Sequence, residues 1–335
     1  MRKPKLVVLG GGTGTFMVLS GLKKYPIELS AVVSMADDGG STGMLRDELG
    51  VLPPGDVRQC LVALSRSDKL MRELMNYRFT NGTLKGHSVG NLLLSALEKI
   101  TGSFDVAVEK ASEILQLEGR VIPATLDKVE LMARLDRGRT IRGERAVYEA
   151  NLKGLRRLEL IPRSRANPKA LRALRDADFI VIGPGDLYSS LIPVLLVPGI
   201  PRAITESKAK KVYICNLMTK AGQTEGFGVY DYVRVIEQYL KGHFDYAVFN
   251  KERPSEDLLK RYARKGEHFV DILKGDKKNT PGKNLKKSTT YVGGNLLSRK
   301  IFIPPKGDPL ARTLIRHNSD RLARLLFRKL IVHTL

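Results

Sequence analysis

Four glycines in five positions follow an apolar run near the start of the chain. Leu6 to Leu9 is uniformly apolar, which is typical of a strand buried on both faces of a parallel sheet. The next residues are Gly10, Gly11, Gly12, Thr13 and Gly14. Glycine lets a backbone turn sharply and approach a ligand closely, and the amides of a following helix favour negative charge. The types and spacing of these residues therefore predict a phosphate-binding turn.

The same turn matches the dinucleotide-binding fingerprint only in part. When G-x-G-x-x-G/A is counted from Gly12, its second glycine falls on Gly14 but its third position falls on Met17. An NAD-binding protein is retained as one alternative. A tight strand-to-helix connection that binds no ligand is another.

Two adjacent carboxylates follow the second apolar run, Leu29 to Ser34. Asp37 and Asp38 come just after it and precede Gly39. An acid beyond the carboxyl end of a parallel strand can hold a ribose hydroxyl, and a pair of acids can hold Mg²⁺ on a diphosphate. A solvated Asp-Gly turn is the alternative.

These side chains need a sheet whose strands run in the same direction. The strand, helix, strand order at the start predicts a parallel pair with a right-handed crossover. Two later apolar runs, Asp178 to Ile182 and Lys211 to Cys215, also end in polar loops, and the second loop begins with Asn216. If the sheet is parallel, these loops share one edge with the glycine-rich turn. We therefore expect an α/β, Rossmann-like, mostly parallel sheet.

Two stretches depart from this alternation of strands and helices. Residues 119–165 contain several short strand-like runs and predict a small β-rich elaboration. Residues 274–300 begin with a polar, lysine-rich stretch that holds Pro281 and Gly282, and they predict a mobile basic loop. The length of 335 residues allows one elaborated domain over residues 1–335.

The composition narrows the class of partner. The chain has 57 Lys and Arg against 35 Asp and Glu, a net charge of +22, which suggests an anionic partner. Aromatic residues make up only 6%, too few to suggest stacking platforms, and no nucleic-acid motif is present, so no specific nucleic-acid partner is expected. The most apolar run, Leu191 to Val197, is too short to span a membrane. Two cysteines without disulfide or metal spacing fit a reducing cytoplasm.

An ordered set of motifs then supports a family resemblance over nearly the whole chain. In order, the motifs are Gly10-Gly11-Gly12-Thr13-Gly14, Ala36-Asp37-Asp38-Gly39-Gly40-Ser41, Leu52-Pro53-Pro54-Gly55-Asp56, Gly86-His87-Ser88, Gly90-Asn91-Leu92-Leu93, Gly183-Pro184-Gly185 and Cys215-Asn216-Leu217-Met218-Thr219. The chain resembles the bacterial gluconeogenesis-factor family (YvcK/GlmR) within the CofD-like superfamily.

The resemblance implies a fold and a function. The fold is a three-layer α/β/α sandwich. The function is that of a cytoplasmic regulator that binds UDP-sugars, UDP-N-acetylglucosamine above all, and links carbon metabolism to cell-wall precursor synthesis and cell shape. A cell-wall precursor enzyme is the implied protein partner, and a homo-oligomer is left open. No cofactor is required for this role. The alternative is a transferase similar to 2-phospho-L-lactate transferase, which would use Mg²⁺.

The resemblance also assigns residues by position. It places Gly12, Thr13 and Gly14 on the diphosphate, with Gly11 in the same turn. Asp37 and Asp38 go to the nucleotide end or to the metal of the transferase alternative, and Asn216 goes to the ligand. Tyr262 and Arg316 match the late aromatic and basic contacts of the family. One departure concerns charge, because Asp186 stands where Ser is usual.

Overall fold

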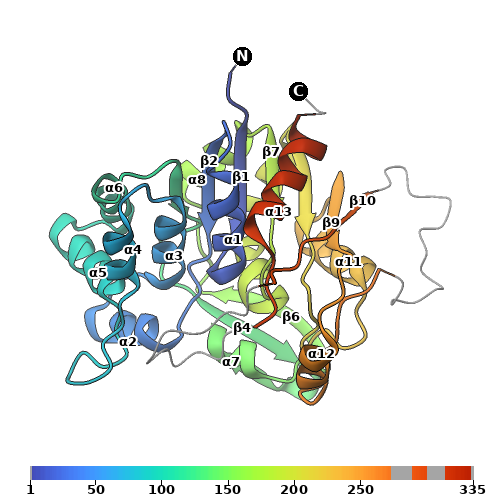
Figure 1. Ribbon diagram of the computed structural model, residues 1–335. Helices are drawn as coiled ribbons and strands as arrows, with labels where there is room; N and C mark the ends of the chain where they lie inside the picture. Colours follow the sequence, from blue (N-terminus) through green and yellow to red (C-terminus); the bar gives the residue numbers. More distant parts are fainter. Residues whose placement is uncertain (1, 273–288, 300–313, 333–335) are drawn as a thin grey trace.

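The computed structural model describes residues 2–272, 289–299 and 314–332 (Figure 1). Its centre is a seven-stranded sheet in which every pair of neighbouring strands is parallel. The strands lie in the order β10 (Thr290–Gly294), β9 (Tyr246–Asn250), β8 (Lys210–Ile214), β7 (Phe179–Ile182), β1 (Lys5–Gly10), β2 (Glu28–Val33) and β3 (Arg120–Pro123). The predicted parallel α/β fold is confirmed.

Strand β1 shows how the sheet separates two apolar cores. Leu6 and Val8 pack into one core, and Val7 and Leu9 pack into the other, because successive side chains of a strand point to opposite faces. Helices cover both faces, which makes the predicted three layers (Figure 1). The first core includes residues of α1 (Gly12–Leu22), α3 (Gly55–Leu64), α5 (Val89–Thr101), α6 (Phe104–Ile114) and α13 (Ser319–Leu325). The second includes residues of α8 (Pro168–Arg175), α9 (Ile192–Leu196), α10 (Ile200–Glu206) and α11 (Val229–Leu240).

Helix α4 (Lys69–Asn76) also contributes to the first core, through Met75. Two more helices are α2 (Gly40–Leu49), which follows the Asp37-Asp38 turn, and α12 (Glu256–Ala263). Leu191, which ends the π-helical turn η2 (Leu187–Leu191), continues directly into α9.

The β-rich elaboration begins later than the sequence suggests. The first of its predicted strands, β3, joins the edge of the large sheet beside β2. The separate antiparallel sheet contains β5 (Thr140–Arg142), β4 (Glu130–Leu135) and β6 (Leu155–Ile161) in that order. The short helix α7 (Glu144–Glu149) lies between β5 and β6 in the chain. In Figure 1 this unit lies below the large sheet, toward the carboxyl ends of its strands.

The predicted loop over 274–300 is interrupted by a strand. Residues 273–288 and 300 lie outside the described residues, but Thr290–Gly294 forms β10 at the edge of the sheet. The β-branched and aromatic residues Thr290, Tyr291 and Val292 favour this strand, which pairs with β9 from Tyr246 onward. The loop assignment was therefore wrong for this part.

No single helix among the described residues is long and apolar enough to cross a membrane. One bent pair, Leu187–Leu196 with Ile200–Glu206, passes the length and composition test together, with an angle of 79° between its halves.

Candidate functional site

A cavity of about 550 Å³ opens where four strands of the large sheet end. The loops after β1, β2, β7 and β8 line it, together with α7 and residues 315–317. This volume lies within the usual range for small-molecule sites. Eight of the nine residues assigned from the resemblance line the cavity: Gly11, Gly12, Thr13, Gly14, Asp37, Asn216, Tyr262 and Arg316. Their binding of a ligand stays a prediction.

The glycine-rich turn forms the N-terminus of α1. The helix begins at Gly12, whose φ of 64° lies in the left-handed region that favours glycine. Gly14 packs directly on the loop after β7, since a Cβ there would lie 1.9 Å from the Pro184 carbonyl oxygen. The first amides of α1 therefore face the cavity beside that loop.

Asp37 is held at the edge of this cavity by its own turn. Its Oδ1 accepts a hydrogen bond of 3.0 Å from the Gly39 amide, and the Thr42 hydroxyl donates to it as well. Burial raises the pKa of Asp37 above its ordinary value, although these hydrogen bonds act in the opposite direction. A buried carboxylate of this kind is stabilised by any cation or hydroxyl that a ligand brings.

Asp38 does not line the cavity. Its Oδ2 accepts from the Glu144 amide at 3.0 Å and its Oδ1 accepts from the Arg145 amide at 2.8 Å, so the carboxylate caps the first turn of α7. The two neighbouring acids therefore have different surroundings.

Of Asp37 and Asp38, the two carboxylates predicted to hold Mg²⁺ under the transferase alternative, only Asp37 lines the cavity. Within residues 2–272, 289–299 and 314–332, no group of three His, Cys, Asp or Glu side chains is placed to hold a metal ion. Asp38 already accepts two backbone hydrogen bonds at α7. Of this pair, Asp37 is the carboxylate that lines the cavity and could contact an ion arriving with a diphosphate, an arrangement that is common for Mg²⁺.

Glu144 brings a second partly buried carboxyl group into the cavity. Burial raises its pKa well above the ordinary value, and the nearby charges of Asp37 and Asp56 raise it further. A hydrogen bond between Glu144 and the Ser189 side chain partly offsets this effect. The surroundings of Glu144 therefore favour its protonated form, which can donate a hydrogen bond to a ligand oxygen.

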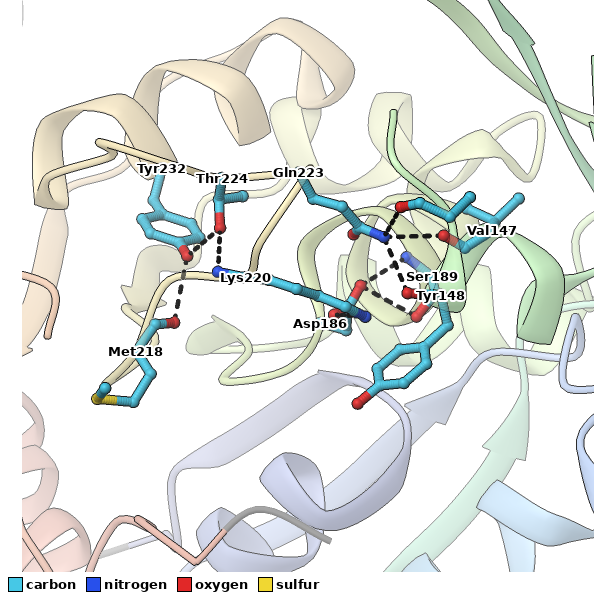
Figure 2. Close-up of polar contacts among 10 residues, drawn as sticks. Val147, Tyr148, Asp186, Ser189, Met218, Lys220, Gln223, Thr224 and Tyr232 are labelled. Atoms are coloured by element: carbon cyan, nitrogen blue, oxygen red, sulfur yellow. Dashed lines mark hydrogen bonds and ion pairs between the residues drawn. The ribbon is translucent and has the colours of Figure 1, made fainter. Parts of the chain in front are cut away.

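Lys220 pairs with Asp186 inside the cavity. The Lys220 Nζ lies 3.0 Å from Asp186 Oδ2 and 2.9 Å from the centre of the Tyr148 ring. Figure 2 shows how these side chains lie. The side chains of Lys220 and Asp186 are only 20% and 17% exposed. The negative charge of Asp186 near the glycine-rich turn is therefore balanced by a lysine from the next loop.

The backbone around Lys220 is fixed by a chain of buried hydroxyl groups. The Lys220 amide donates to Thr224 Oγ1 at 2.8 Å, and the Tyr232 hydroxyl donates to the same oxygen at 2.9 Å (Figure 2). The loop also holds α7 from its other end, because Gln223 Nε2 contacts the carbonyl oxygens of Val147, Tyr148 and Ala150 at 2.9–3.0 Å. Helix α7 is thus anchored at both ends.

A buried arginine supports the opposite wall of the cavity. Arg58 is 5% exposed, and its guanidinium donates to Asn91 Oδ1 at 3.0 Å and to Asn76 Oδ1 at 2.5 Å. Asn91 donates in turn to the Ser41 hydroxyl at 3.2 Å, which lies 3.1 Å from His87 Nδ1. These contacts fix the start of α2 against the cavity.

The last wall combines the loop after β8 with the segment that precedes α13. The Tyr262 hydroxyl accepts hydrogen bonds from the amides of Leu314 and Ile315 at 2.8 and 3.3 Å. Burial lowers the pKa of His317 to about 4, so its ring is neutral at physiological pH. Asn216 and Arg316 lie on the same wall.

Several cavity residues were not assigned to the site from the sequence. They are Asp56, Arg58, Glu144, Tyr148, Lys220 and His317. A signal existed for Lys220, since it lies four residues after Asn216 in a predicted edge loop. No local sequence pattern indicated Glu144 and Tyr148, because the β-rich elaboration that carries them reaches the cavity only through tertiary folding.

Comparisons with known proteins agree with this architecture. The family model of 2-phospho-L-lactate transferase CofD matches residues 6–289. A relative from Thermotoga maritima is 45% identical over 97% of this chain and 98% of its own length. The gluconeogenesis factor of Bacillus subtilis is 41% identical over 81% of this chain and 86% of its own length.

A solved structure extends the likeness to the fold. The crystal structure of a member of the UPF0052 family from Bacillus halodurans has a TM-score of 0.86 and 36% identity, and the match covers 98% of this chain and 100% of that one. The chain therefore carries a CofD domain and belongs to the gluconeogenesis-factor family.

Proposed function

We propose that the cavity binds a nucleotide diphosphate sugar, with UDP-N-acetylglucosamine as the preferred ligand. The supporting observation is that eight residues assigned from the family resemblance line one cavity of about 550 Å³. The N-terminus of α1 suits a diphosphate at the middle of the cavity. The walls on either side, near Asp37 and near Asn216, then take the nucleoside and the sugar.

The charges of the cavity support a ligand that brings its own donors. Six acidic residues line it, Asp37, Asp56, Glu144, Glu149, Asp186 and Glu267, against five basic ones, Arg58, Arg78, Arg145, Lys220 and Arg316. A bare polyanion is poorly matched by such a lining. A ligand with sugar and ribose hydroxyls offers hydrogen bonds to the carboxylates while its diphosphate faces the helix N-terminus.

Isothermal titration calorimetry tests this function. UDP-N-acetylglucosamine should give saturable one-site binding, and NAD at the same concentration should bind more weakly. Asn216→Ala should weaken binding about tenfold, as expected for loss of a ligand hydrogen bond. Asn81→Ala, an exposed site away from the cavity lining, is the matched control. No heat at millimolar ligand with a protein of normal circular dichroism would reject the proposal.

The biological role that follows is regulatory and cytoplasmic. A protein that binds a cell-wall precursor without consuming it can report the supply of that precursor to an enzyme of the same synthesis. The family name of the relatives supports a connection to gluconeogenesis. The protein partner and the oligomeric state are testable by co-purification with and without the nucleotide sugar.

A transferase is the second candidate, because the matching family model describes 2-phospho-L-lactate transferase. In that case an acceptor hydroxyl attacks a phosphorus of the nucleotide-activated substrate and the nucleotide leaves. Mg²⁺ would reduce the charge of the diphosphate, and Asp37 is the carboxylate placed to contact it. Mass spectrometry after incubation with donor and acceptor should detect the product, and Asp37→Asn should abolish it. Equal inertness of wild type and variant would remove this candidate.

A further inference from the structure

The Lys220–Asp186 ion pair lies at the wall of the cavity, where an ion pair is not needed to stabilise the fold. Both side chains line the cavity, and the loop that carries Asp186 packs against Gly14 in the glycine-rich turn. Exposed ion pairs contribute little to stability, and buried ones often lose as much by desolvation as they gain. A pair at the wall of a ligand cavity, next to the start of a helix, therefore suggests a role in binding.

Lys220 differs from Arg58 and Arg145, two other basic residues of the cavity lining. The guanidinium of Arg58 donates hydrogen bonds to Asn91, Asn76 and the Met75 carbonyl oxygen. Arg145 pairs with Glu149 at 3.0 Å and is 55% exposed, so solvent screens its charge. Lys220 is largely buried, and its ammonium group has three donors, of which Asp186 uses one.

We propose that Lys220 binds the anionic, phosphate-bearing part of the ligand, and that Asp186 is the competing carboxylate that holds Lys220 until the ligand arrives. This inference rests on the proposed function, since it assumes a phosphate-bearing ligand in the same cavity. Tyr148 supports the ammonium group from the side, through its ring face. The fixed backbone of Lys220, held through Thr224 and Tyr232, sets where the side chain can reach.

The two carboxylate oxygens of Asp186 have different partners, so its capping of η2 can be separated from its ion pair with Lys220. Its Oδ1 accepts from the amide and the hydroxyl of Ser189 at 3.1 and 3.0 Å and caps η2, while its Oδ2 contacts Lys220. Asp186→Asn can keep the Oδ1 contacts and lose the ion pair. Lys220→Met keeps the length and apolar body of the side chain and loses its charge.

Calorimetry on these variants tests the inference with four probes: inorganic diphosphate, UDP, UDP-N-acetylglucosamine and uridine. Lys220→Met should weaken the three anionic probes about tenfold or more and leave uridine unchanged. Asp186→Asn should strengthen the anionic probes about threefold or more, because the competitor is removed. In the double variant this gain should disappear. Lys208→Met, which removes the charge of an exposed lysine, should match wild type.

The outcomes separate this inference from the proposed function. If UDP-N-acetylglucosamine binds wild type but Lys220→Met and Asp186→Asn leave every anionic probe unchanged, the inference is wrong and the function stands. If wild type binds inorganic diphosphate with the expected dependence on Lys220 but does not bind the nucleotide sugar, the function is wrong and the inference stands. If Asp186→Asn still strengthens binding of the anionic probes when Lys220→Met is also present, Asp186 acts only by repelling the anions. That result would overturn the role of Lys220. Should Lys220→Met not fold, Lys220→Arg should retain binding of the anionic probes, and loss of binding in that folded variant would contradict the inference.

Discussion

At the scale of single residues, the cavity separates neighbours that look alike in the sequence. Asp37 faces the cavity and has a raised pKa from burial, whereas Asp38 caps a helix. Glu144 is a third carboxyl whose surroundings disfavour its charge. The energetic cost of keeping such groups buried is characteristic of binding sites, where a ligand relieves it.

Glu144→Gln should stabilise the ligand-free protein, and more so at pH 8 than at pH 5. The pKa of Glu144 is higher in the folded chain than its ordinary value of 4.5, so the folded protein binds this proton more tightly than the unfolded chain does. The resulting stability is present at low pH and is lost as pH rises through the folded pKa. Gln keeps a polar group that can hydrogen-bond to Ser189 and removes the charge.

Thermal unfolding at the two pH values measures the effect. One pKa unit corresponds to about 1.4 kcal/mol, which moves the Tm of a chain of this size by about 2 °C or more. Glu149→Gln, on the exposed side of the same helix, serves as the control and should change Tm less at either pH. A Tm gain for Glu144→Gln that shrinks on going from pH 5 to pH 8 would contradict the linkage argument.

At the scale of elements, α7 depends on contacts from two distant loops. Six residues are too few for a stable isolated helix, so its position must come from its ends. Asp38 supplies the N-terminal contact across 106 positions of sequence, and Gln223 supplies the C-terminal one. Because α7 carries Glu144 and Tyr148, these contacts also position the cavity wall.

Asp38→Ala and Gln223→Glu should each loosen α7 without unfolding the sheet. Loss of a helix cap costs about 1 kcal/mol, and the glutamate adds a negative charge against three carbonyl oxygens. Hydrogen–deuterium exchange of residues 144–149 should speed up about fivefold or more, while peptides of β1 and β7 stay protected. Gln238→Glu, an exposed position on α11, is the control. Unchanged exchange in α7 in both variants would show that the helix is held by other contacts.

These long-range contacts also explain what the sequence could and could not predict. Apolar runs that end in glycine, Asp37 or Asn216 follow the local rules of parallel sheets, and the structure brings their loops to one cavity. The strand β10 was not predicted, because it is short and the lysine-rich stretch before it led the whole region to be interpreted as a loop. The places of Lys220 and Glu144 follow from contacts 34 and 106 positions away, for which no local pattern exists.

At the scale of the whole molecule, the chain is strongly basic but the lining of its cavity is nearly charge-balanced. The chain carries a net +22, yet acidic residues outnumber basic ones by six to five in the cavity lining. The positive charge therefore lies mostly elsewhere, as with Arg134, Arg156 and Arg157 on the antiparallel sheet, which are 51%, 75% and 70% exposed. Long-range attraction of polyanions and binding in the cavity should be separable by salt.

We expect the two kinds of binding to respond differently when the salt concentration rises from ~50 to ~200 mM. A short labelled DNA duplex, bound only through exposed Lys and Arg, should lose more than about tenfold in affinity in fluorescence anisotropy, because binding releases condensed counterions. UDP-N-acetylglucosamine, bound in a nearly charge-balanced cavity, should lose less than about threefold in calorimetry over the same range. Saturating nucleotide sugar should not displace the duplex, since the two occupy different surfaces. Displacement, or an equally steep salt dependence for both ligands, would mean that the cavity itself is the polyanion site.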